Sequence, residues 1–144
     1  MNAAETIREI YAQYFAASEQ AEQKRKPTDG MFGLGKKPAD DPCHTAFYDS
    51  LIAAVTELAQ QNPDPETVRE ILAYIYGLPE ANREPVSVYW MLIAAHGTTD
   101  ALIPMLTPQD AASLYADYDK RFRRRERMPV QKNILRVLKK ASGS

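Results

Sequence analysis

The chain has too little cysteine and histidine, and too short an apolar run, for several classes of protein. Its 144 residues include one cysteine, Cys43, and two histidines, His44 and His96. A single cysteine excludes an intramolecular disulfide framework, and this set of residues falls short of a structural zinc site unless carboxylates complete it. The longest apolar run, 86–95, covers about half of the roughly 20 residues that a transmembrane helix needs. We therefore expect a cytoplasmic protein without a transmembrane span and without a metal.

The chain also lacks the patterns of a secretion signal and of β-strands. Glu5 and Glu9 stand where a signal peptide would have an uninterrupted apolar segment. No segment sustains the strict alternation of a half-buried strand, whereas apolar residues recur at helical spacing outside the loops. The predicted fold class is all-α, a compact bundle of six or seven helices forming a single domain over 1–144. Helical-repeat-like hairpins, such as the one suggested by 101–118, are an alternative, although a solenoid needs about three or more similar units.

The predicted helices follow from apolar periodicity and from capping residues. Asp64 and Thr107 each precede a proline, which is the usual order at the start of a helix, so we expect both to be N-caps. Gly77 and Pro79 are expected to end the helix that Asp64 begins. The segment 85–96 is apolar on nearly every side, which predicts a central helix. The expected helical ranges are 3–26, 43–61, 65–76, 85–96, a short or kinked segment within 98–106, 107–128 and 130–140.

One long loop is predicted between the first two helices. Residues 27–42 contain three glycines and three prolines, a composition that opposes helix and favours a flexible loop. Within it, 30–36 matches the first seven positions of a phosphate-binding loop, but Lys37 replaces the Ser or Thr that holds magnesium and no strand precedes it. We therefore expect no nucleotide cofactor. The apolar residues of this loop either insert into a partner or fold back on the bundle; they are Met31, Phe32 and Leu34.

Positive charge is concentrated in the C-terminal segment 120–140. It holds ten of the chain's 18 Lys and Arg residues and one acid, Glu126, a local net charge of +9 in a chain of net charge −1. Such asymmetry between two parts of a chain is a hint of contact with nucleic acid or a membrane. The candidate contacts with a partner or with phosphates are Lys120, Arg121, Arg123, Arg124, Arg125, Arg127, Lys132, Arg136, Lys139 and Lys140.

The last predicted helix, 130–140, is basic and amphipathic, and three interpretations compete for it. It packs on the bundle with its charges toward solvent or toward the acidic part of the chain, or it binds phosphates, or, least favoured, it lies on a membrane or in a partner groove. The tyrosines fall on the apolar stripes of their own helices, which indicates packing at the core or its rim rather than base stacking.

The sequence contains no catalytic constellation. Cys43 and His44 are adjacent on a predicted helix and do not face each other, and His96 is expected at a helix C-terminus, where it would complement the dipole. The leading hypothesis is a non-catalytic helical adaptor that binds a protein partner or a second copy of itself. The alternative is an accessory protein that contacts nucleic-acid phosphates through 120–140.

Overall fold

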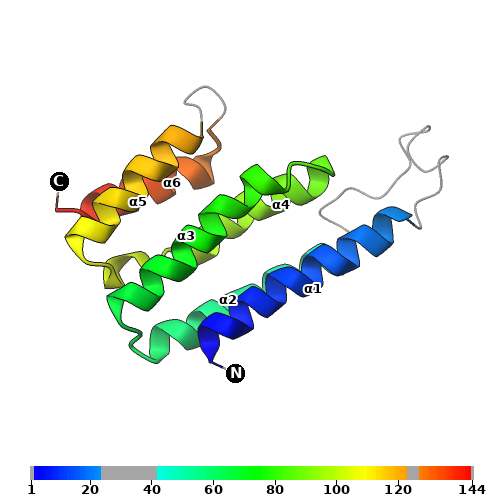
Figure 1. Cartoon of the computed structure of the whole chain (residues 1–144), viewed down its shortest axis with the longest axis horizontal. Helices are drawn as coiled ribbons and strands as arrows, with labels where there is room; N and C mark the ends of the chain where they lie inside the picture. Colours follow the sequence, from blue (N-terminus) through cyan, green and yellow to red (C-terminus); the bar gives the residue numbers. More distant parts are fainter. Residues whose placement is uncertain (1, 24–41, 123–126, 144) are drawn as a thin grey trace. The chain divides into compact units, whose positions relative to one another are not determined.

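The computed structural model of the chain describes residues 2–23, 42–122 and 127–143. These residues form six α-helices and two short 3₁₀ helices, with no β-strand among them, which confirms the all-α class (Figure 1). The chain divides into two compact units, Met1–Ala54 and Val55–Ser144, which are described separately below. The single domain over 1–144 stays a prediction, and helical-repeat-like hairpins are not confirmed. No helix of the described ranges is long and apolar enough to cross a membrane.

The first unit consists of α1 (Ala3–Gln23) and the first part of α2 (Pro42–Gln60). Asn2 caps α1: its Oδ1 accepts a hydrogen bond from the Glu5 N–H at 2.8 Å. The two helices are joined through aromatic packing, with the rings of Tyr14 and Phe47 stacked at 4.2 Å and Tyr11 meeting Phe47 edge-on at 5.1 Å. The apolar stripe predicted for the first helix is therefore its buried side. The predicted loop 27–42 lies outside the described residues, apart from Pro42 at the start of α2.

The second unit contains the end of α2, then α3 (Pro65–Ala81), α4 (Val86–Ala95), η3 (His96–Thr99), η4 (Ile103–Met105), α5 (Pro108–Arg121) and α6 (Pro129–Ala141). Helices α5 and α6 lie side by side, and α3 packs against both α4 and α5 (Figure 1). The predicted caps are confirmed. Asp64 accepts from the Thr67 N–H at 2.9 Å, and Thr107 accepts from the Asp110 N–H at 3.1 Å. Hydrogen bonds from the Thr67 side chain and, to a smaller extent, from its N–H lower the pKa of Asp64.

Helix α3 does not end at Gly77 and Pro79 as predicted, since it continues to Ala81 with Pro79 inside it. A proline in this position has no N–H for the carbonyl four residues earlier, and its ring crowds that carbonyl, which here belongs to Ile75. The Ile75 carbonyl interacts with His96 of η3 instead. The helix ends where Asn82 caps it, with its side-chain amide donating to the Leu78 carbonyl at 2.9 Å.

Two further expectations are wrong in part. Helix α4 is not surrounded on every side, because Val86 is 55% exposed and Trp90 is 44% exposed. Helix α5 ends at Arg121 rather than near 128, and Phe122 follows in an extended conformation with its side chain buried. The buried side of α5 includes Leu114 and Tyr118, whereas Tyr115 is half-buried.

Candidate functional site

The solvent side of α6 carries four cations in one row. They follow one another at intervals of four, three and one residues, which places them within an arc of about 100° on a helix of 3.6 residues per turn. All four side chains are exposed, and α6 contains no acidic residue. We call this set the basic stripe: Lys132, Arg136, Lys139 and Lys140.

The opposite side of α6 is used by its own unit. Ile134, Leu135 and Leu138 are buried, and the helix packs on α5, η3 and η4. The contact with η3 is close: a Cβ added to Gly97 would lie 3.3 Å from Val130 Cγ2. The predicted basic amphipathic helix is thus present, and it packs on its own chain through its apolar side. Its basic side faces solvent.

None of the four cations of the stripe forms an ion pair with another described residue. Within the described ranges, Lys132, Lys139 and Lys140 form no ion pair, although that part of the chain includes many acids. The side chain of an exposed lysine without an ion pair is free to rotate, so these ammonium groups are mobile and available to bind an anion. The stripe is therefore an uncompensated region of positive charge on a fixed helix.

Arg136 differs from the three lysines because it is anchored. Its Nη2 donates to Asn133 Oδ1 at 2.6 Å, and Asn133 Nδ2 donates in turn to Asp100 Oδ2 at 3.1 Å. Asp100 follows η3, so this chain of hydrogen bonds connects α6 to the segment beneath it. The other carboxylate oxygen of Asp100, Oδ1, is buried and has no hydrogen-bond partner among the described residues.

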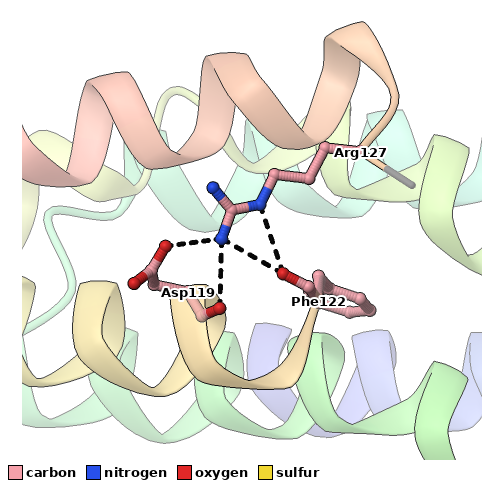
Figure 2. A network of polar contacts seen from close by, with 3 residues as sticks. All are labelled: Asp119, Phe122 and Arg127. Carbon is pink, nitrogen blue, oxygen red and sulfur yellow. Dashed lines mark hydrogen bonds and ion pairs between the residues drawn. The ribbon is translucent and has the colours of Figure 1, made fainter. Parts of the chain in front are cut away.

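Arg127 does not belong to the exposed cations. Its side chain turns back over the end of α5, where Nη2 donates to the carbonyl oxygens of Asp119 and Phe122 and to the Asp119 carboxylate (Figure 2). The Nε atom also donates to the Phe122 carbonyl, at 3.2 Å. The last carbonyls of a helix have no partner within it, so Arg127 caps α5 and balances its dipole. The side chain is 12% exposed.

The other cations of the predicted set have different positions. Arg121 pairs with Glu80 of α3 at 3.2 Å and is 26% exposed, whereas Lys120 is exposed. Arg123, Arg124 and Arg125 lie outside the described residues, as do the loop candidates Met31, Phe32 and Leu34. Of the ten predicted contacts, the structure thus brings four together on α6 and engages two within the protein.

A buried polar network lies at the centre of the second unit, and sequence reasoning missed it. His96 Nδ1 and the Tyr118 hydroxyl are 2.8 Å apart. Thr99 donates its hydroxyl proton to the His96 carbonyl at 2.7 Å, so the Tyr76 hydroxyl, 2.7 Å from Thr99 Oγ1, must donate to that oxygen. Phe122 completes the aromatic surroundings of the histidine ring. The network connects α3, η3 and α5.

His96 is neutral in this network. Burial lowers the pKa of His96 to about 3, against a raising effect of the Ile75 carbonyl, and the charge of Arg121 lowers it further. Burial likewise raises the pKa of Tyr76 and of Tyr118. The Tyr118 hydroxyl faces Nδ1 and can donate to it, so we assign the proton of the neutral ring to Nε2, for which no hydrogen-bond partner is found within the described part. The prediction that His96 complements a helix dipole is therefore wrong.

The remaining candidates for chemistry do not converge. His44 is buried, with Nδ1 2.7 Å from the Tyr14 hydroxyl. The residues described contain no group of three or more His, Cys, Asp or Glu side chains placed to hold a metal. An open hollow of about 190 Å³ on the first unit has Tyr14 and Phe47 in its wall and no charged residue. Among the described residues, the basic stripe therefore remains the candidate site.

Comparison of the chain with protein-family models, with curated proteins and with solved structures finds no match.

Proposed function

We propose that the protein is a non-catalytic helical interaction module that binds an acidic protein surface through the basic stripe of α6. The single observation that carries this proposal is the arrangement of α6. Its apolar side is fixed in the second unit, and its other side presents Lys132, Arg136, Lys139 and Lys140 to solvent. A row of like charges on a rigid helix attracts a complementary surface and sets its orientation.

The charges alone do not provide high affinity. An exposed ion pair contributes about 0.2–1 kcal/mol, so four pairs contribute on the order of 1–4 kcal/mol, less than the cost of bringing two proteins together. A stable complex therefore also needs apolar contacts. In this proposal Trp90 and Val86 of α4 provide them, since both are exposed and tryptophan is enriched among the residues that dominate binding energies.

A nucleic-acid partner is the second candidate, because lysines without acidic partners also suit phosphates. Two observations favour a protein instead. Arg121 and Arg127, which were predicted to contact phosphates, are engaged with Glu80 and Asp119. The chain as a whole has a net charge of −1, so a long polyanion would meet repulsion beyond the stripe, whereas a limited acidic surface would not.

The experiment compares two labelled probes by fluorescence anisotropy, from low to physiological salt. One is a helical peptide with glutamates spaced to face the stripe, and the other is a random-sequence duplex of similar length. The variant Lys132→Ala/Lys139→Ala removes two cations of the stripe. The control variant Arg83→Ala/Lys120→Ala removes the same charge from exposed positions outside the stripe.

We expect the peptide to bind and the stripe variant to bind it roughly fivefold more weakly, as about 0.5 kcal/mol for each lost pair implies. The control variant should bind nearly as well as the wild type. A duplex that binds more tightly than the peptide, with an affinity that falls steeply with salt, would establish the nucleic-acid alternative. Equal loss in the stripe and control variants would reject the stripe as a specific site.

The proposal extends to the kind of partner and to location. A second copy is one such partner, because α1 carries four glutamates and one arginine along its length. Sedimentation at low and at high salt tests this, and a monomer at every salt concentration would exclude it.

We also propose a cytoplasmic location, in which Cys43 stays reduced. The thiol of Cys43 should be alkylated at an ordinary rate, as expected of a non-catalytic cysteine.

A further inference from the structure

We infer that Arg136 is the specificity-determining residue of the basic stripe. Asp100 and Asn133 are positioning residues that orient its guanidinium to bind a carboxylate of the partner. This inference rests on the proposed function, since it names the chemical group that the stripe recognises. It distinguishes one anchored cation from three mobile ones.

The geometry leaves Arg136 able to form a paired contact. A guanidinium carries five N–H groups arranged along two forked edges, and both edges share Nη2. The bond from Nη2 to Asn133 Oδ1, at 2.6 Å, uses one of these N–H groups. One complete edge therefore remains for two parallel hydrogen bonds to a planar carboxylate, a geometry that a lysine ammonium cannot offer.

The anchor beneath Arg136 is firm. Asp100 follows Thr99, which is fully buried and hydrogen-bonded to both His96 and Tyr76, so its backbone has little freedom. Its Oδ2 accepts from Asn133 Nδ2 at 3.1 Å, which orients the amide so that Oδ1 faces Arg136. The Asn133 amide, itself held by the Asp100 carboxylate, therefore fixes the Arg136 side chain, which would otherwise sample many rotamers.

The competing explanation is that only the number of charges on the stripe matters. The two explanations make opposite predictions for Asp100. Removing its negative charge makes the region more positive, so a purely electrostatic surface would bind an acidic peptide more tightly. If Asp100 positions Arg136, the same change frees the guanidinium and weakens binding, because the Arg136 side chain must then lose conformational entropy when the partner binds.

The test uses the glutamate peptide described above and measures its affinity for three variants of the full chain. Asn133→Ala removes the bridge without changing charge, Asp100→Ala removes the anchor and adds positive charge, and Arg136→Lys keeps the charge but loses the fork. Lys139→Arg is the matched control. The fluorescence and thermal midpoint of each variant verify that it is folded, and the surface change Arg136→Lys keeps the test possible if Asp100→Ala does not fold.

We expect each of the three variants to bind about threefold more weakly, the loss that ordering one long side chain implies, while Lys139→Arg stays close to the wild type. Tighter binding by Asp100→Ala, or unchanged binding by both Asn133→Ala and Arg136→Lys, would overturn the inference while the proposed function stands. A wild-type protein that does not bind the peptide at all would overturn both.

Discussion

Replacing His96 by phenylalanine should destabilise the second unit at neutral pH. In acid, most of this difference in stability between the variant and the wild type should disappear. Phenylalanine keeps a ring between Tyr76 and Phe122 but has neither nitrogen. The Tyr118 hydroxyl, whose hydrogen bond to Nδ1 is 2.8 Å long, would then have lost this buried partner. A buried polar group left without its partner costs about 1–3 kcal/mol, so we expect a loss near 2 kcal/mol above pH 7.

The pH dependence follows from the state of the histidine. In the folded chain burial lowers the pKa of His96 to about 3, whereas in the unfolded chain a histidine has a pKa of about 6.5. Between these values the unfolded state binds a proton that the folded state excludes. The wild type therefore loses up to about 1.4 kcal/mol of stability for each pH unit from roughly 6.5 down to 3, and no more below that range. The phenylalanine variant has no such loss, so the difference between the two proteins should vanish near pH 5 by these values.

Urea unfolding at a series of pH values measures this difference. The chain's one tryptophan, Trp90, lies in the second unit and contacts the ring of Tyr89, so its fluorescence reports on that unit. The comparison between the two proteins cancels groups that titrate in both. A stability difference that stays the same from pH 7.5 to pH 5 would refute a buried, neutral His96.

A double-mutant cycle with Tyr118→Phe tests the hydrogen bond itself. Removing both partners of one bond should cost less than the two single changes together, with a coupling of about 1 kcal/mol. Additive effects would mean that the 2.8 Å contact between His96 and Tyr118 contributes nothing to stability.

Three further changes address the capping and packing of α5 and α6. Arg127→Ala should lower the unfolding free energy by about 1–2 kcal/mol, since the last carbonyls of α5 lose their donor; an unchanged urea midpoint would show that Arg127 does not stabilise the end of α5. Thr107→Ala removes the N-cap and should cost about 1 kcal/mol in the same measurement, and no loss would mean that water replaces the cap. Gly97→Val should cost about 1–3 kcal/mol because an added Cβ already lies 3.3 Å from Val130. Its control, Gly77→Ala, meets nothing within 4 Å and should be neutral or stabilising; equal effects of the two would contradict the close approach of α6 to η3.

The local features of the fold were predictable because they depend on neighbours in sequence. Asp64 and Thr107 cap helices as expected, since a cap needs only a polar side chain and the N–H three residues later. The basic and apolar sides of α6 were predictable for the same reason. Apolar residues at helical spacing must face a core, and that places Lys132 and Arg136 on the other side.

Features that depend on distant residues were not predictable. Pro79 was expected to end α3, but the carbonyl that it leaves without an N–H partner interacts with His96, which comes from another element of the second unit. Arg127 was placed among the exposed cations, yet it caps α5. No local pattern distinguishes an arginine that will cap a helix from one that will face solvent.

The sequence by itself determined the helical class, the caps and the amphipathic character of α6, because these follow from spacing and from the chemistry of single residues. Only the tertiary structure decided which cations remain exposed and which are engaged, and why His96 is neutral. These outcomes depend on which groups burial brings within hydrogen-bonding distance. The anchoring of Arg136 through Asn133 to Asp100 is of the same kind, since it connects residues of α6 to the residue that follows η3, which only folding places together.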